Sequence, residues 1–584
     1  MVVVHPTTAI YHIIMTKVLL LDGYIDEPTC LGVPPYISPY PRYIAGALHA
    51  SQKDNDVYYL TIDQLRHNPK HPLLFKAHFI IVIAGMVVPG KYLGGYPASP
   101  HELHKFLSPA YQAKKILCGP AARHGFGISG GKHAKPTETL PQLFDAVITG
   151  DPEIVLYDFF SQRQTISNLQ PDMHRINTAL LGIFATKGAG IVKQHPNYPN
   201  YIIAEIETYR GCSRNITGGC SFCIEPMKGM PLHRPIKDVV GEIEALHSQG
   251  IRHFRLGNQP CLFSYQAQDS EKHEFPQPNP KAIEQLYKGI RRVAPHLRTL
   301  HMDNANPGII AHFPKECKQI IKTIIKYHTA GDVAALGMET ADPVVVKQNN
   351  LKASSEDVES AIHLFNELGC TRGGNGLPEL LPGLNFVFGL KGETKNTFAL
   401  NYEFLQNMTK QGYLLRRINL RQVIAFPKTE MATIGNKLVK KHKHLFQQFK
   451  RGVQQHIDQT LLKKVAPTGT ILCELYTEKH DGKLTFGRQL GSYPLLVGIP
   501  GVFPLGTFMD VKIVDHGFRS LTAVPYPLDI NKVPRQTIEA LPRIGQKRAL
   551  RILRNRPIKN ITQLKKAIDD PLVIETIKPY LLLE

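Results

Sequence analysis

The chain has 584 residues, enough for three or four domains that each bury a core of their own. Hydrophobic residues make up 43% and charged residues 20%, which excludes a small disulfide scaffold, a disordered chain, a collagen and a coiled coil. The formal net charge of +21 favours a polyanionic partner but says nothing about the fold.

The positive charge is concentrated toward the C-terminus. Residues 431–584 carry a net charge of +13, against +8 for residues 1–430. Within residues 532–566, eleven Lys and Arg side chains stand beside a single acid, Glu539. A solvated helical face has this composition, and so does a surface that binds nucleic acid.

The sequence contains no obvious membrane or export signal. No run approaches the roughly 18 consecutive apolar residues that span a bilayer. The N-terminus has neither a basic segment nor a small-residue cleavage site, so we expect a cytoplasmic protein without a membrane partner. Met15-Thr16-Lys17 resembles the usual start of a first strand, and residues 1–14 are interpreted as an upstream extension of the reading frame.

Two stretches alternate short apolar strands with helical patterns. From about residue 17 to residue 160 this alternation predicts βαβ units and a parallel sheet. Ligands of such sheets sit at the carboxyl ends of the strands, where turns are expected at Gly23, Gly119 and Gly150. The second stretch, about residues 201–429, has six strand-like segments and predicts a partial or full α/β barrel.

The last quarter of the chain has a different pattern. A polar helical connector is expected over residues 437–462, followed over 469–525 by short strands that Gly and Pro interrupt, typical of a small β-barrel. Basic helices follow from about 537 to 581. The predicted fold class is therefore α/β, in four domains: a parallel-sheet domain of flavodoxin or Rossmann type (15–165), an α/β barrel (195–435), a small β-barrel (465–527) and a helical hairpin (530–584).

Three of the nine cysteines, Cys212, Cys220 and Cys223, lie together in the segment YRGCSRNITGGCSFC. In a cytosolic enzyme such a cluster is more typical of metal binding than of disulfides. Three thiolates fit a structural zinc site poorly, unless a histidine such as His233 completes it. Three thiolates also leave one iron of a four-iron cluster open, because full ligation takes four.

At this segment the sequence resembles the radical S-adenosylmethionine (radical SAM) superfamily. The stretches ETYRGC and CSFC are similar to the C-x3-C-x2-C loop of that family, but seven residues separate Cys212 from Cys220, which we expect to add one small turn. The resemblance implies that Cys212, Cys220 and Cys223 ligate a [4Fe-4S] cluster. It also implies reductive cleavage of S-adenosylmethionine to a deoxyadenosyl radical, with electrons from a low-potential donor such as ferredoxin or flavodoxin.

Further similarities follow in order along the chain. The segment LGMETADP resembles the G-[VL]-E-S-G-S stretch of the family, and FGLKGET resembles F-G-L-P-G-E-T, with Lys391 where proline is usual. The aromatic residue before the last cysteine matches a position that packs near the adenine. The cofactor-binding residues that the resemblance implies are Phe222, Gly257, Asn258, Glu339, Gly389 and Glu393.

The N-terminal domain resembles the cobalamin-binding-like domain that precedes many radical SAM cores, through VPPY, CGP and VITGDPE. The D-x-H-x-x-G motif that supplies a cobalt ligand is absent, although relatives without it bind cobalamin. An auxiliary iron–sulfur cluster would need three cysteines, and this domain has only Cys30 and Cys118, which suit a buried apolar environment equally well. Cobalamin and a second Fe-S cluster both stay open as additional cofactors.

The C-terminal segments resemble nucleic-acid-binding modules. GTILCEL and LGTFMDVKIV are similar to the TRAM barrel, which follows the core in RNA methylthiotransferases and binds RNA. LPRIGQKRALRIL resembles a helix-hairpin-helix, whose I-G turn presents backbone N–H groups to a phosphate. Such contacts position nucleic acid without reading its sequence. The candidate contacts are Arg543, Gly545, Lys547, Arg548 and Arg551.

The sequence therefore predicts a radical SAM enzyme of methylthiotransferase or methyltransferase type, with RNA, and specifically tRNA, as its substrate. One alternative is a cobalamin-dependent radical SAM methylase of a protein or small molecule, with the basic tail as a docking surface. The other is a nucleic-acid-binding protein without catalysis.

Overall fold

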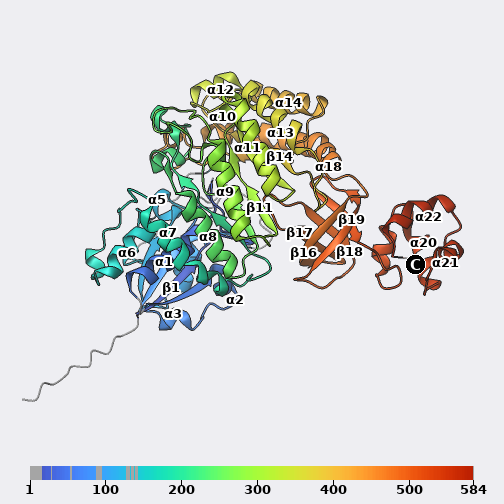
Figure 1. Cartoon of the computed structure of the whole chain (residues 1–584), viewed down its shortest axis with the longest axis horizontal. Coiled ribbons are helices and arrows are strands. Elements are labelled where there is room, and N and C mark those ends of the chain that lie inside the picture. Colours follow the sequence, from blue (N-terminus) through green and yellow to red (C-terminus); the bar gives the residue numbers. More distant parts are fainter. Residues whose placement is uncertain are drawn as a thin grey trace, which may run out of the picture. The chain divides into compact units, whose positions relative to one another are not determined.

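The structure is a computed structural model that describes residues 16–27, 29–52, 55–86, 95–126, 132, 134, 137 and 142–582 (Figure 1). The interpretation of residues 1–14 lies outside these residues. The chain forms two compact units, one of Met1–Gly127 with Lys135–Pro199 and one of Ile128–Ala134 with Asn200–Glu584. The second unit contains three of the four predicted domains, whose boundaries stay a prediction. No helix in the described ranges is long and apolar enough to cross a bilayer.

The first unit is built on a parallel sheet with strand order β3-β1-β4-β5-β6. Counted along the sequence this is the order 2-1-3-4-5 of flavodoxin-like folds, which confirms the predicted type. The strands are apolar and mostly buried, as parallel strands usually are. The elements are β1 (Thr16–Asp22), β2 (Tyr36–Ile37), α1 (Pro39–Ser51), β3 (Asn55–Thr61), α2 (Ile62–His67), α3 (Leu73–Lys76), β4 (Phe79–Ile83), α4 (Pro100–Leu107), β5 (Lys114–Cys118), α5 (Pro120–His124), β6 (Ala146–Val147), α6 (Pro152–Ser161) and α7 (Ala179–Lys187).

Helices α1 and α7 of this unit approach each other backbone to backbone. A Cβ atom added to Gly46 would lie 1.8 Å from the carbonyl oxygen of Phe184, and one added to Gly188 would lie 1.8 Å from that of Arg42. Neither oxygen can move without shifting its helix. Glycine at both positions is therefore what allows the two helices to pack so closely.

The α/β part of the second unit has six parallel strand positions. The first three strands lie in the order β7-β10-β11, and β12, β13, β14 and β15 follow in sequence order. Asp303 alone separates β11 from β12, so the two sheets continue one another. The strands are β7 (Ile203–Ile206), β10 (His253–Leu256), β11 (Thr299–Met302), β12 (Asn304–Ala305), β13 (Asp332–Glu339), β14 (Leu380–Phe388) and β15 (Arg417–Gln422).

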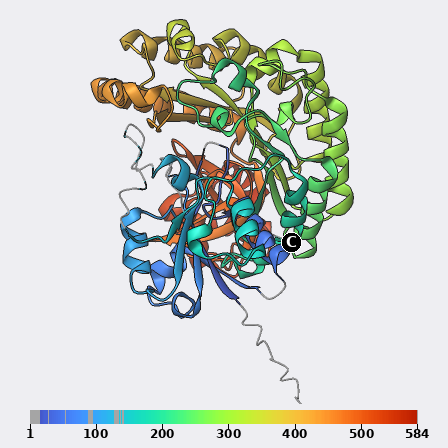
Figure 2. The same cartoon turned by 90° about the vertical axis from the view of Figure 1, so that its left-hand side faces the viewer.

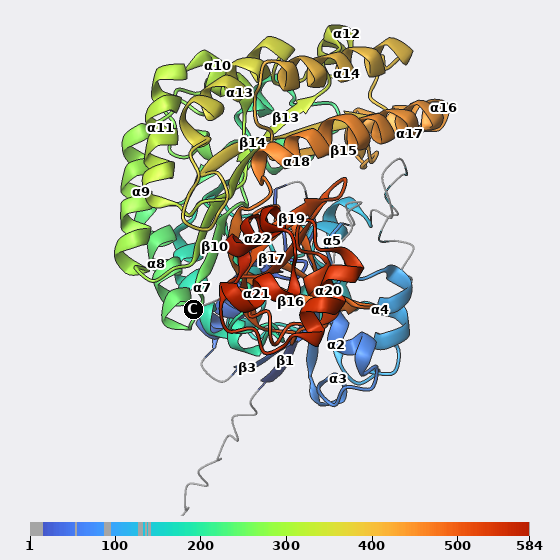
Figure 3. The same ribbon diagram turned by 90° about the vertical axis from the view of Figure 1, so that its right-hand side faces the viewer.

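Helices cover the outer side of this curved sheet, green to yellow in Figures 2 and 3. They are α8 (Ile236–Ser248), α9 (Pro280–Val293), α10 (Pro307–His312), α11 (Pro314–Tyr327), α12 (Pro343–Gln348), α13 (Ser355–Gly369) and α14 (Lys395–Lys410). The predicted connector forms α16 (Lys437–Lys441), α17 (Lys443–Gly452) and α18 (Gln459–Val465), after the short α15 (Met431–Ile434). The expected βα alternation is thus confirmed.

The two faces of the sheet can be told apart at β14. Phe388 packs against Phe398 of α14 and Phe449 of α17, so this side of the strand faces the helices. Successive side chains alternate between faces. Asn385 therefore points to the inner side of the curved sheet, as does Asn419, its partner in register on β15.

The small β-barrel is closed, with strand order β16-β17-β18-β20-β19 (orange in Figure 1). Its loop 490–493, here called the floor loop, reaches the inner side of the α/β sheet. The Ser492 amide donates to His301 Nδ1 at 2.8 Å, and the Tyr493 hydroxyl donates to Asp303 at 2.5 Å. The strands are β16 (Ile471–Asp481), β17 (Leu484–Gln489), β18 (Leu496–Pro500), β19 (Phe508–His516) and β20 (Ser520–Pro525).

Four short helices follow the barrel, with an apolar core that includes Leu541, Ile544 and Ile552. The second helix begins at Gly545, the glycine of the predicted turn, whose φ is +56°. The helices are α19 (Arg535–Glu539), α20 (Gly545–Arg554), α21 (Ile561–Ala567) and α22 (Pro571–Ile577).

The close approach of α1 and α7 makes a stability prediction. Gly46→Ala should destabilise the protein by about 1–3 kcal/mol, because the added methyl meets backbone that cannot yield locally. Gly190→Ala is the matched control, since no atom lies within 4 Å of its added Cβ. Thermal unfolding followed by circular dichroism should show a lower midpoint for Gly46→Ala only; equal midpoints for both variants would contradict the packing argument.

Candidate active site

Cys212, Cys220 and Cys223 lie on the loop that follows β8 (Tyr209–Arg210), and all three are free thiols. Gly211 turns the chain into this loop with φ +84°, and a Cβ there would lie 2.4 Å from the carbonyl oxygen of Met230. The Cys212 amide donates to the Gly229 carbonyl at 3.0 Å. The loop is therefore folded back on itself before the first cysteine.

The seven residues between Cys212 and Cys220 contain a short 3-10 helix, Ser213–Thr217. This is the additional turn expected from the spacing. The Asn350 side chain donates to the carbonyl oxygens of Thr217, at 2.8 Å, and of Gly219, at 2.9 Å. The longer loop is thus fixed by a residue that lies outside it.

Arg214, within this longer segment, contacts a candidate ligand directly. Its guanidinium donates to Cys220 Sγ at 2.9 Å and to the Asn350 side chain at 3.1 Å, and it pairs with Glu274. The superfamily resemblance gave no role to Arg214. The sequence feature that could have pointed to Arg214 is its position as a basic residue inside the cysteine loop.

Glu339 ends β13 with φ +53°, directly after a break in the register between Gly337 and Glu339. Such a bulge re-aims a side chain at the end of a strand. Lys352 Nζ lies 3.1 Å from Glu339 Oε1. Burial alone would lower the pKa of Lys352, but the charges of Glu339 and Cys220 raise it above the usual lysine value. Lys352 was not predicted from the sequence.

The three thiols do not converge on a single point in the described part of the chain. Among the residues that the structure describes, no three His, Cys, Asp or Glu side chains converge on one metal position. A [4Fe-4S] cluster needs no such point, because each thiolate ligates a different iron. Burial raises the pKa of Cys212 to about 12, so metal binding would release protons from this loop. Arg214 and Lys352 would balance the negative charge of the bound thiolates.

The zinc alternative depended on His233, which has other partners. Its Nε2 lies 3.3 Å from Ser270 Oγ, and its Nδ1 accepts from the Gln266 amide at 3.3 Å. Burial lowers the pKa of His233 to about 4, so the ring is neutral. The structure gives no support to His233 as a fourth ligand.

A second asparagine ties the loop to the segment after β14. Asn349 accepts from Ser221 Oγ at 2.8 Å and donates to the Lys391 carbonyl at 2.8 Å. The predicted residues Gly389 and Glu393 flank Lys391, and the Gly389 amide donates to the Glu393 carboxylate at 2.6 Å. Asn349 was not predicted, although it adjoins Asn350 in the sequence.

The other predicted cofactor residues have identifiable neighbours. Phe222 packs against an apolar cluster that includes Leu390 and Met431. Gly257 and Asn258 follow β10 at the carboxyl edge of the sheet, and the Asn258 side chain donates to Glu207 at 2.9 Å. Their roles toward a cofactor stay predictions.

The predicted nucleic-acid contacts divide into two kinds. Arg548 pairs with Asp570 at 2.8 Å, and Arg551 pairs with Asp569 at 3.0 Å. Arg543, Gly545 and Lys547 are exposed around the turn before α20. Two of the five candidate residues are therefore paired with acids that lie just beyond the basic segment 532–566.

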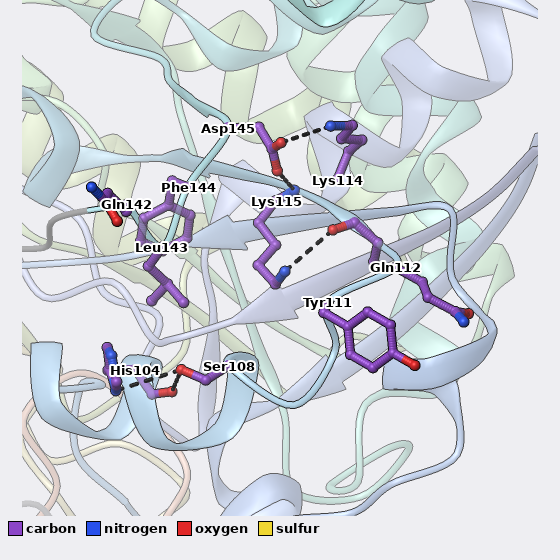
Figure 4. A pocket seen from close by; sticks show the side chains of 11 residues that line it. His104, Ser108, Tyr111, Gln112, Lys114, Lys115, Gln142, Leu143, Phe144 and Asp145 are labelled. Carbon is purple, nitrogen blue, oxygen red and sulfur yellow. Dashed lines mark hydrogen bonds and ion pairs between the residues drawn. The ribbon is translucent and has the colours of Figure 1, made fainter.

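The first unit contains a cavity of about 490 Å³ at the amino ends of β5 and β6 (Figure 4). Its charged lining is satisfied internally: Lys114 pairs with Asp145 at 3.0 Å, and Lys115 Nζ donates to the Ala113 carbonyl at 3.3 Å. Ligands of open α/β sheets bind at the opposite, carboxyl edge. Two cysteines of this unit, Cys30 and Cys118, are buried, as expected of small apolar side chains.

Comparison with known proteins gives a consistent picture. The model of the radical SAM superfamily matches residues 206–405. The uncharacterized protein MJ0274 of Methanocaldococcus jannaschii is 48% identical over 510 residues, which cover 87% of this chain and 92% of that protein. The ribosomal protein uS12 methylthiotransferase RimO of Psychrobacter sp. is 25% identical over 304 residues, covering 50% of this chain and 51% of its own.

Among solved structures, the radical S-adenosylmethionine methyltransferase TsrM from Kitasatospora setae is similar over 80% of this chain and 79% of its own, with 14% identity and a TM-score of 0.46. The match to the superfamily model and the full-length archaeal relative identify the class: the chain belongs to the family of MJ0274, within the radical SAM superfamily.

The chain is therefore a radical SAM enzyme whose cofactors are a [4Fe-4S] cluster and S-adenosylmethionine. When bound, these cofactors would supply radical chemistry directed at the substrate. The residues that would hold the cluster are Cys212, Cys220 and Cys223. The protein's own contribution is to fix their loop through Asn349 and Asn350.

Replacing Cys212, Cys220 and Cys223 together by Ala should remove the brown chromophore and abolish reductive cleavage of S-adenosylmethionine, because a cluster cannot be held without its thiolates. Absorbance, iron content and 5′-deoxyadenosine formation would be measured after anaerobic reconstitution. Cys473→Ala, which changes a thiol on the small barrel, should leave all three unchanged. Cleavage retained by the triple variant would show that the ligands lie elsewhere.

Proposed function

We propose that the chain modifies RNA, with tRNA as the expected substrate, by transferring a methylthio or methyl group to a carbon atom. The observation that supports the proposal is a closed five-stranded barrel in direct contact with the inner side of the curved α/β sheet that runs from β7 to β15, here called the catalytic sheet. The segments of that barrel resemble the TRAM module of RNA methylthiotransferases. RimO, whose name states a methylthiotransferase activity, is a partial relative.

The C-terminal helices supply a second argument for a polyanionic substrate. Arg543 and Lys547 flank an exposed Gly545, and nothing lies within 4 Å of a Cβ added to that glycine. Open space at a turn allows a phosphate to approach the backbone N–H groups. The turn opens a helix of ten residues, so the N-terminal N–H groups of α20 favour an anion there.

A protein substrate is the second candidate, because the name of RimO states that it acts on a ribosomal protein. The same basic surface would then dock an acidic partner rather than a nucleic acid. The cobalamin-dependent form of this alternative requires cobalt in the first unit. Metal content and substrate class therefore need to be measured together.

The double variant Arg543→Gln with Lys547→Gln should bind bulk tRNA more weakly and with a flatter salt dependence. Each lost phosphate contact lowers the slope of log K against log salt by roughly 0.7 to 0.9, because fewer counterions are released. Lys237→Gln with Lys281→Gln removes the same charge from exposed positions on α8 and α9 and should leave the slope unchanged. Equal slopes for the two double variants would contradict a phosphate site at the α20 turn.

RNA from a strain that lacks the gene should be missing one modified nucleoside, seen by liquid chromatography and mass spectrometry of digested tRNA and rRNA. Reintroduced wild-type enzyme should restore it, and the triple cysteine variant should not. Anaerobically purified protein would be analysed for iron, sulfide and cobalt: iron and sulfide beyond one cluster favour methylthiolation, and cobalt favours methylation. If the RNA of the deletion strain is unchanged but the mass of a ribosomal protein differs, the RNA proposal is wrong and the protein substrate is favoured.

A further inference from the structure

The last strand of the catalytic sheet, β15, places three polar side chains on its inner face: Arg417, Asn419 and Arg421 alternate with Ile418 and Leu420. The register that pairs Asn385 with Asn419 assigns this face to the inner side, opposite the Phe388 cluster.

Two of the three inner residues already have partners. The Arg417 guanidinium lies 3.8 Å from the centre of the Tyr493 ring of the floor loop. The Asn419 side chain donates to Asn385 Oδ1 at 3.1 Å. These contacts fix the side chains nearer the amino end of β15.

Arg421 is different. Its Nε is buried and has no hydrogen-bond partner, and its guanidinium forms no ion pair within the described part of the chain. By contrast, Arg255 on the same inner side pairs with Glu205 at 2.5 Å and with Asp303. A buried N–H donor without a partner is costly, and the Arg421 side chain as a whole is only half-buried, so the rest of the guanidinium is not enclosed by the protein. Such a group is expected where a ligand completes it.

We propose that Arg421, with the Asn385–Asn419 pair beside it, binds a phosphate group of the substrate on the inner side of the catalytic sheet. A guanidinium offers a fork of N–H donors that fits a phosphate, and neither β15 nor the facing Val387 supplies a carboxylate to compete for it. The choice of phosphate rests on the proposed function. A carboxylate, such as that of S-adenosylmethionine, would fit the same fork.

Arg421 lies close to the edge of the sheet at which the cofactors are expected. Arg421 lies two residues beyond Asn419, roughly 7 Å further toward the carboxyl edge of the sheet. Glu339 ends β13 at that edge, and the cysteine loop is tied through Asn349 to Lys391, which follows β14 at the same edge. A nucleotide held there by its phosphate would be anchored beside the cofactors, while the α20 turn binds the rest of the RNA.

The site can be probed directly in the intact, cluster-loaded enzyme. Phenylglyoxal labelling of arginines, read by peptide mass spectrometry, would be repeated with inorganic phosphate, with a short single-stranded RNA and with S-adenosylmethionine. Phosphate and RNA should slow the labelling of Arg421 and leave exposed Arg292 on α9 unaffected. The proposal would be overturned if neither phosphate nor RNA slowed the labelling of Arg421, or if only S-adenosylmethionine slowed it. It would also be overturned if Arg421 were never labelled.

Turnover then separates this site from the proposed function. Arg421→Gln should raise KM for tRNA of the deletion strain about tenfold or more, the loss expected for a hydrogen bond to a charged group. Arg421→Lys should recover part of it, and Arg292→Gln should match the wild type. A wild-type KM in Arg421→Gln overturns the site while RNA modification stands. If wild-type enzyme modifies no RNA, the proposed function fails, and the labelling experiment still decides whether Arg421 binds phosphate.

Discussion

The candidate active site depends on two adjacent asparagines, Asn349 and Asn350. The cysteine loop has little regular secondary structure of its own, so its backbone groups must find partners elsewhere. The Asn350 side chain donates to two carbonyl oxygens of the loop. The Asn349 side chain accepts from the Ser221 hydroxyl and donates to the Lys391 carbonyl. Since both residues follow α12, one short segment sets the position of the loop against the sheet.

The inner side of the sheet in the second unit contains buried charged side chains. Charges taken out of water need partners, and removing one member of a buried pair costs about 3–5 kcal/mol. Arg255 pairs with both Glu205 and Asp303, and the Tyr493 hydroxyl of the floor loop donates a hydrogen bond to Asp303. The floor loop of the small barrel thereby packs against the inner side of the catalytic sheet. Under the proposed function, a substrate held by the barrel would be tied to the geometry of the site.

Much of the architecture follows from local patterns. Apolar strands that alternate with helical stretches predict parallel sheets, and both appear, as does the five-stranded barrel over the Gly- and Pro-interrupted segment. The extra turn in the cysteine loop follows from its spacing alone. Asn349, Asn350 and Lys352 could not be found this way, because they reach the loop from more than a hundred residues along the chain. The ion pairs of Arg548 and Arg551 were not predicted for a simpler reason, since their acids lie just beyond the basic segment 532–566.

The class of chemistry was predictable from the sequence alone through the resemblance of the cysteine segment to the radical SAM loop, because three cysteines within twelve residues are a local feature that needs no fold to be recognised. It also determined where the excess of basic residues lies. Which charges have partners can be read only from the folded chain: Arg255 and Arg421 look alike in the sequence, yet among the described residues Arg255 forms ion pairs and Arg421 forms none. The reason is physical, since the energy of a charge depends on what burial brings within a few ångströms of it, and that is set by packing between distant segments.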